Sequence, residues 1–193
     1  MKTGYASAVE LAWSRLAALP PNAVCRRCGA RWEEGTYYLS WLSREVALPQ
    51  GKPPELILWL HYLLSEGAGP PRGTWMSYRE APGARFYEAK FMQRATRPLA
   101  AHFGGTPERL AAAGARLGGA AAGVGDVSVT VPLLPYLPLT YVLWSGDEEF
   151  EPSGGVLFDR TASGWLCAED LAVAASLGAY ALIAEDKKSG REA

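Results

Sequence analysis

The chain has 193 residues, of which 49% are hydrophobic and 20% are charged, and its formal net charge is −1. A chain of this length and composition can bury one sizeable core, so we expect a single folded domain rather than a disordered segment. A net charge near zero, with lysine and arginine scattered along the sequence, provides no overall field for nucleic acid or anionic lipid. We therefore expect neither nucleic acid nor a membrane among its partners.

The start of the chain predicts an amphipathic helix that ends at Pro20-Pro21, because apolar residues recur at helical spacing and two prolines cannot continue a helix. Glu10 and Arg15 interrupt the apolar stretch that a signal peptide would need. The longest apolar run, residues 56–64, is shorter than the roughly 18 residues of a membrane span. Three cysteines indicate no disulfide framework, and we expect a cytoplasmic protein.

The middle of the chain mixes strand and helix patterns. Residues 30–51 favour strands joined by tight turns. A helix near residues 55–66 follows two prolines and is apolar around nearly its whole circumference, so we expect it to be the buried central helix. Residues 75–80 predict a short strand, and residues 84–103 predict a helix that is kinked at Pro98.

The second half predicts another helix, several strands and a closing helix. The first helix starts at Thr106-Pro107-Glu108, where a hydroxyl, a proline and an acid form a start signal, and it ends at Gly118-Gly119. Glu169-Asp170 begins the closing helix, which we expect to run to about Ile183. The predicted strands cover residues 127–134, 139–144 and 155–159.

Helices and strands alternate without a repeated strand–helix unit, which favours an α+β fold over a doubly wound sheet. We expect one domain over residues 1–185, with a mixed or mainly antiparallel sheet flanked by helices. Residues 186–193 are expected to be a frayed C-terminal tail.

Cys25 and Cys28 are spaced as in half of a zinc knuckle. A closed zinc site needs four ligands, whereas Cys167 is isolated in the sequence and the two histidines lie far apart. Neighbouring arginines would lower the pKa of a thiol and favour redox chemistry instead. The pair is thus a candidate metal or redox site, and structural cysteines are the alternative.

His61 lies between apolar neighbours on the predicted central helix. It is either a core imidazole with hydrogen-bonded nitrogens or an axial ligand or general base in an aromatic pocket. His102, near a predicted helix end, is expected to be a capping residue that favours the helix dipole.

The segment "WMSYREAPG" places Trp75, Ser77 and Arg79 on one face of the predicted strand and Glu80 on the other. A serine–arginine face beside an aromatic ring suits an anionic ligand, although an arginine paired with a nearby acid is an equally good interpretation. Together with His61, these four residues form the candidate ligand-binding site, provided that all of them open onto one cavity.

Acids cluster in "LWSGDEEFEPSGGVLFDR". On an extended chain Asp147 and Glu149 point to the same side, and Asp159 would supply a third oxygen for a magnesium, calcium or manganese ion. The alternative is the solvated tip of a long hairpin, because glycine and proline flank the acids.

Seven segments in order along almost the whole chain carry a family resemblance: "GYASAVELAW", "LHYLL", "WMSYREAPG", "FGGTPERL", "LWSGDEEFEP", "VLFDRTASGWL" and "EDLAV". At these segments the chain resembles domain of unknown function 3786, a prokaryotic family that is frequent in anaerobes. The resemblance implies a soluble prokaryotic protein that assists anaerobic redox or cofactor metabolism. Some relatives are joined to cysteine segments of the iron–sulfur type, and this chain has no such segment.

Three hypotheses of function follow. The first is a ligand-binding or accessory protein that holds an anionic tetrapyrrole or corrinoid at His61, Arg79 and Glu80, or docks to a metalloenzyme. The second is a metal-dependent enzyme that uses the acids at 147, 149 and 159, with His61 or Glu80 as the base. The third is a structural interaction module. The sequence identifies no particular cofactor, and it leaves the oligomeric state open.

Overall fold

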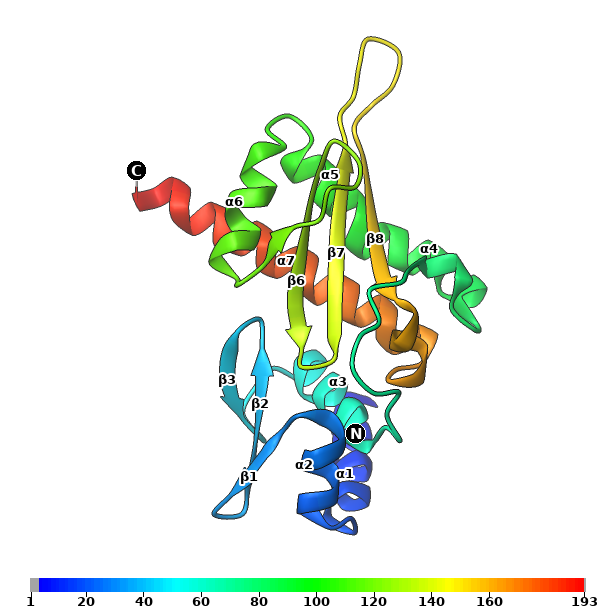
Figure 1. The fold of residues 1–193 in the computed structure, drawn as a ribbon, viewed down its shortest axis with the longest axis vertical. Helices are drawn as coiled ribbons and strands as arrows, with labels where there is room; N and C mark the ends of the chain where they lie inside the picture. The colour runs from blue at the N-terminus through cyan, green and yellow to red at the C-terminus, as the bar shows by residue number, and fades with distance from the viewer. Residues whose placement is uncertain (1–3, 193) are drawn as a thin grey trace.

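Two antiparallel sheets organise the chain, which in this computed structural model is described from residue 4 to residue 192 (Figure 1). The smaller sheet has the strand order β1-β2-β3, and the larger has the order β4-β8-β7-β6-β5. Helices pack against both sheets, and the buried apolar residues form one core. The predicted α+β class, with mainly antiparallel pairing, is therefore confirmed.

The smaller sheet and two helices come from the first part of the chain. The turn between the first two strands has positive φ at both Glu34 and Gly35, the backbone twist that a tight hairpin needs. A second helix begins at Pro21, which was expected only to end the first; proline suits the first helical position because its missing N–H would have no partner there. The elements are α1 (Gly4–Ala17), α2 (Pro21–Cys28), β1 (Arg31–Glu33), β2 (Thr36–Trp41) and β3 (Arg44–Ala47).

The predicted central helix is α3 (Pro53–Leu64), and it is buried as expected. Its first turn is fixed by the Glu55 carboxylate, which accepts a hydrogen bond of 3.1 Å from the backbone N–H of Lys52. Apolar side chains on nearly all sides then pack against α1, α2 and α7. His61 lies on the partly exposed side of this helix.

The larger sheet is built from two consecutive hairpins and two short edge strands. The connection between β6 and β7 is tight, whereas the loop between β7 and β8 is long and extends beyond the rest of the molecule at the top of Figure 1. The strands are β4 (Trp75–Ser77), β5 (Ala120–Ala121), β6 (Val127–Leu134), β7 (Leu137–Trp144) and β8 (Ser153–Asp159).

The segment predicted as one helix over residues 84–103 consists of four pieces. Its irregularity lies just before Pro98, where Arg97 N–H bonds to Met92 O in a π-helical turn. The proline has no N–H for the preceding turn, and this π-helical turn lies next to the position where a kink was expected. The pieces are η2 (Ala84–Phe86), α4 (Glu88–Phe91), the π-helix η3 (Met92–Thr96) and α5 (Arg97–Phe103), and α6 (Glu108–Arg116) follows.

The closing helix, α7 (Ala168–Glu192), runs along one face of the larger sheet with α4, α5 and α6 beside it (Figure 1). It continues beyond Ile183, so the expected frayed tail is helical over the part that the structure describes. The cause is Asp186, which is buried and accepts hydrogen bonds from Arg109 and, at 2.7 Å, pairs with Nε2 of His102. His102 lies in the last turn of α5, near a helix end as expected, but its side chain bonds to Asp186 on α7 and does not act as a cap.

Of the helices within residues 4–192, none combines the length and the apolar character that crossing a membrane requires.

Candidate functional site

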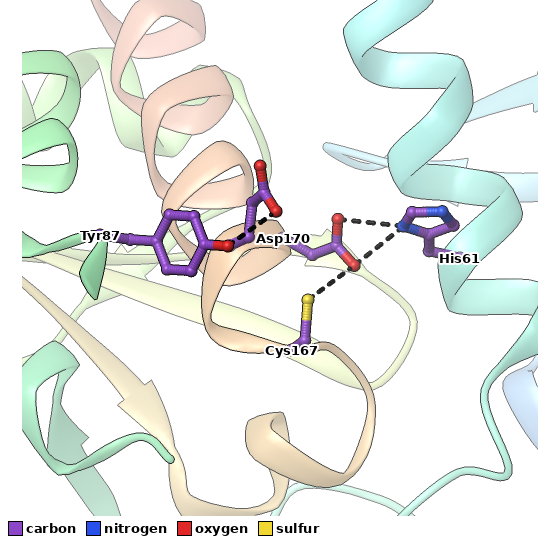
Figure 2. A network of polar contacts seen from close by, with 5 residues as sticks. His61, Tyr87, Cys167 and Asp170 are labelled. Carbon is purple, nitrogen blue, oxygen red and sulfur yellow. Dashed lines mark hydrogen bonds and ion pairs between the residues drawn. The ribbon is translucent and has the colours of Figure 1, made fainter. Parts of the chain in front are cut away.

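A histidine and an aspartate from distant parts of the chain meet where α3 lies beside the start of α7 (Figure 2). Nδ1 of His61 lies 3.0 Å from Oδ1 and 2.9 Å from Oδ2 of Asp170. The imidazole is 40% exposed and the carboxylate is 15% exposed. The pair is therefore half-buried and open to solvent on one side.

The local sequence explains both positions. Asp170 lies in the first turn of α7, where a carboxylate is stabilised by the positive end of the helix dipole. His61 lies on the partly exposed side of α3, whose other sides are packed against the core. Packing of α3 against α7 then brings the imidazole to the carboxylate.

The hydrogen bond to Asp170 raises the pKa of His61, and it outweighs the opposing effect of partial burial. The negative charge of Asp170 acts in the same direction, while Arg15 opposes it. Because the carboxylate accepts from Nδ1, the neutral imidazole carries its proton on Nδ1. Its Nε2 has no hydrogen-bond partner among the side chains and backbone groups that the structure describes.

Cys167 is the third member of this network, and its Sγ donates to Oδ2 of Asp170 at 3.3 Å (Figure 2). Burial is the main cause that raises the pKa of this thiol. The carboxylate thus lies between the thiol and the imidazole. A cysteine nucleophile needs a base in direct contact with its sulfur and a lowered pKa, so this arrangement does not activate Cys167.

The network faces a cavity of about 500 Å³, here called the His61 cavity. Its walls are mainly apolar, with Tyr5 and Ala8 from α1, Ile57 from α3 and Val173 from α7. A mostly apolar cavity with a few convergent polar groups is the usual form of a small-molecule site.

A second cavity of about 240 Å³, the Lys90 cavity, adjoins the first, because Tyr5, Glu169 and Val173 line both. At their boundary the hydroxyl of Tyr87 donates to the Glu169 carboxylate at 3.1 Å. Lys90 lines this cavity but not the His61 cavity. The two cavities form one groove along the first turns of α7.

The structure places the four other candidate ligand-binding residues elsewhere. Of the described residues, those that line the His61 cavity come from α1, α3 and the start of α7, and Trp75, Ser77, Arg79 and Glu80 are not among them. The strand ends at Ser77 and a 3-10 turn follows, so the expected alternation of faces does not continue to residues 79 and 80.

These side chains have local partners instead. Arg79 is exposed and pairs with Glu88. The Glu80 carboxylate accepts hydrogen bonds from Ser77 N–H at 2.7 Å and from Arg160 at 2.8 Å. The alternative interpretation of the sequence, an arginine paired with an acid at the sheet edge, describes this segment.

The two cysteines of the CxxC segment lie on α2. The thiol of Cys28 is buried and donates to Val24 O at 3.0 Å. Burial raises the pKa of Cys28 to about 11 and also raises that of Cys25, so neither thiol has the low pKa of a redox cysteine.

The three acids proposed as cation ligands do not converge. Asp147 is exposed in the β7–β8 loop, where its Oδ1 accepts from the N–H groups of Glu149 and Phe150 at 2.9 and 2.8 Å. Asp159 lies at the opposite end of β8 from this loop. With about 3.3 Å per residue, the length of this strand separates Asp159 from the hairpin tip by roughly 20 Å.

Asp159 has a structural role. It is 1% exposed, and its Oδ2 accepts from the N–H groups of Arg72, Gly73 and Thr74 at 3.0, 2.7 and 3.2 Å. Its Oδ1 accepts from the N–H and hydroxyl of Thr161. Burial alone would raise the pKa of Asp159, but these hydrogen bonds together hold it below its ordinary value.

Within residues 4–192, no group of three or more histidine, cysteine, aspartate or glutamate side chains is arranged to hold a metal ion. The residues that sequence reasoning missed are Asp170, Cys167, Tyr87 and Lys90. The acids of "EDLAV" were recognised only as a helix start, and no local signal linked them to His61, which lies 109 positions away.

The fold and site thus define an α+β protein with a two-part groove and a histidine oriented by an aspartate. The family model described as Domain of unknown function (DUF3786) matches residues 20–181 of the 193 residues, and the chain belongs to this family. The resemblance seen in the sequence is therefore confirmed. No curated protein and no solved structure matches the chain.

Proposed function

We propose that the protein is a ligand-binding or accessory protein that holds a metal-bearing cofactor of the tetrapyrrole or corrinoid class in the His61 cavity. One observation supports this most strongly. Asp170 holds Nδ1 of His61, and the other ring nitrogen has no partner within the described part of the chain.

This arrangement is the one that an axial imidazole ligand needs. A histidine that binds a metal usually donates its second ring N–H to a carboxylate, which fixes the tautomer and makes the coordinating nitrogen more basic. Haem iron and similar centres need only one such nitrogen from the protein, because the macrocycle supplies the other ligands. A site with one available imidazole and apolar walls therefore suits a metal carried by a macrocycle better than a free ion.

The biological setting belongs to the same proposal. A cofactor-holding accessory protein fits the anaerobic redox and cofactor metabolism that the family resemblance implies. The arrangement of Cys167, Asp170 and His61 offers no activated nucleophile, which favours holding a cofactor over hydrolytic catalysis.

The first test is native mass spectrometry and visible absorbance of the protein isolated without oxygen. We expect a bound species of cofactor mass and an absorbance band in the visible range. The purified protein is then titrated with haemin and with cobalamin, and His61→Gln should abolish the band shift. Asp170→Asn, which keeps the imidazole but removes its charged partner, should weaken binding by about 10- to 100-fold.

Lys187→Gln, an exposed change far along α7, is the control and should bind like the wild type. The proposal is wrong if neither macrocycle binds the wild-type protein, or if His61→Gln binds them as tightly as the wild type does.

A further inference from the structure

Two cations line the Lys90 cavity without an ionic partner. Lys90 on α4 and Arg94 on the π-helix η3 both face it, and neither side chain pairs with a carboxylate among the side chains that the structure describes. Two arginines of neighbouring elements are paired, Arg79 with Glu88 and Arg109 with Asp186. An unpaired pair of cations in a cavity is a candidate anion site.

The backbone holds this pair in place. In an α-helix the N–H of residue 98 would bond to the carbonyl of Arg94, but Pro98 has no N–H. The hydroxyl of Ser176 on α7 donates to Arg94 O instead, at 3.2 Å. The distorted helix is thereby fastened to α7 at the edge of the cavity, and π-helical turns are frequent at functional sites.

Charge is unevenly distributed along the groove. Glu169 and Asp170 lie toward the His61 cavity, and Lys90 and Arg94 lie at the other end. Glu169 borders both cavities, but its carboxylate accepts from Tyr87 and lies in the first turn of α7, where the helix dipole offsets part of its charge. The Lys90 cavity therefore carries two positive side chains against one negative side chain.

We propose that Lys90 and Arg94 anchor an anionic substituent, a carboxylate or a phosphate, of the molecule whose body occupies the groove. The inference rests on the proposed function because it describes the other end of the same ligand. It specifies an amphipathic ligand with a broad apolar body, an acidic side group at Lys90 and Arg94, and a metal or electropositive centre at His61. The side chains of Tyr5 and Val173, which border both cavities, contact the body.

The test uses two fluorescent probes that differ in one charge. The first is 8-anilinonaphthalene-1-sulfonate, and the second is N-phenyl-1-naphthylamine, which has the same aromatic body without the sulfonate. We expect Lys90→Ala with Arg94→Ala to weaken binding of the sulfonate probe by about tenfold, since both side chains are exposed and two exposed charge pairs together contribute about that factor. Binding of the uncharged probe should stay unchanged.

The matched control is Arg85→Ala with Arg97→Ala, which removes the same charge from the neighbouring η2 and α5 segments. It should bind both probes like the wild type. Raising the salt to about 1 M, where the Debye length is about 3 Å, should reduce the wild-type preference for the charged probe.

The inference is overturned by any of three results: neither probe binds the wild type, the Lys90 and Arg94 variant binds the sulfonate normally, or the control variant loses as much. The probes carry no metal, so the wild-type preference for the sulfonate reports the anion anchor without a metal–imidazole bond. Failure of macrocycle binding at His61 and failure of the anion anchor are therefore separate outcomes.

Discussion

The Asp170 carboxylate lies 2.9 Å from Nδ1 of His61, 109 positions away in sequence, and the contact joins the central helix to the start of the closing helix. It fixes the tautomer of the imidazole and raises its pKa, and His61 lines the His61 cavity. The rise in pKa comes from the hydrogen bond that the Asp170 carboxylate accepts and, to a smaller extent, from its negative charge. Asp170→Asn keeps the shape of the side chain and removes its negative charge, so this substitution separates the electrostatic effects on His61 from packing.

Asp170→Asn should lower the pKa of His61 toward its ordinary value, because it weakens the hydrogen bond that is the largest cause of the upward shift and removes the negative charge. The ring protons of His61 report this directly in an NMR titration, and His61→Gln assigns the signal against that of His102. An unchanged titration of His61 in Asp170→Asn would show that the carboxylate does not control the imidazole.

The same pair should make stability depend on pH. The folded pKa of His61 is raised, so the stabilisation from the pair is full below the unfolded pKa of about 6.5 and is lost as the pH rises through the folded pKa. Asp170→Asn should thus lose more free energy of unfolding near pH 6 than near pH 9. With the imidazole 40% exposed, solvent screening limits the difference to about 1 kcal/mol or less. Urea unfolding at both pH values measures this difference in the free energy of unfolding. In a His61→Gln background, the effect of Asp170→Asn should no longer differ between the two pH values.

Gly178 on α7 lies against the hydroxyl end of Tyr141, and this hydroxyl donates to Ala175 O at 2.9 Å. A Cβ at residue 178 would overlap the tyrosine hydroxyl, so α7 approaches β7 this closely only because the residue is glycine. Gly178→Ala should therefore destabilise the protein by about 2 kcal/mol or more, as overpacking of a core does.

Gly190 in the same helix provides the control, since a Cβ there meets nothing within 4 Å. Gly190→Ala should be neutral or stabilising by up to about 1 kcal/mol, because alanine favours the helix. Thermal unfolding of both variants gives the comparison. Equal effects at the two positions would show that α7 does not depend on close contact with Tyr141.

The spacing of apolar residues and the positions of prolines were enough to predict most of the helices and strands. The α3 helix begins at two prolines and is buried along its apolar run, and the strands of the larger sheet follow alternating or continuous apolar segments. These features depend on a few neighbouring residues. Even the distortion before Pro98 follows from the absence of one N–H group.

The site depends on contacts that no local pattern encodes. The sequence singled out His61 but joined it to Arg79 and Glu80, whereas its actual partner, Asp170, was recognised only as a helix-start acid. The strand assigned to residues 75–80 ends at Ser77, because the Glu80 carboxylate turns back to the Ser77 N–H and closes a 3-10 turn. Side chain to backbone bonds of this kind compete with a sheet and are hard to foresee.

The C-terminal end of α7 provides another prediction. Asp186 is 4% exposed, and its carboxylate bonds to Arg109 of α6 and His102 of α5. Asp186→Ala should destabilise the protein by about 2 to 3 kcal/mol, since it leaves two part-buried donors without an acceptor. Hydrogen exchange should show that the amides after Ile183 lose protection. Glu149→Ala, an exposed acid of the hairpin loop, should change neither property.

Asp159 tests the structural interpretation of the acids against cation binding. Its carboxylate accepts three N–H bonds from residues 72–74 and two bonds from Thr161, so it fastens the loop before β4 to the end of β8. Asp159→Asn should cost about 2 to 4 kcal/mol at pH 7, because an amide cannot accept all of these bonds and turns its own donors toward them.

The stabilisation that Asp159 contributes should depend on pH with the opposite sign to that of the His61–Asp170 pair. The folded pKa of Asp159 is lowered, so its stabilisation is full above the unfolded pKa of about 3.9 and is lost as the pH falls through the folded pKa. The difference between the wild type and Asp159→Asn should shrink as the solution is acidified below that range. Asp147→Asn is the control; it caps an exposed loop and should cost about 1 kcal/mol or less. A rise in melting temperature on adding magnesium, calcium or manganese that both substitutions abolish would contradict a purely structural role for Asp159, because it would place the two carboxylates at one ion.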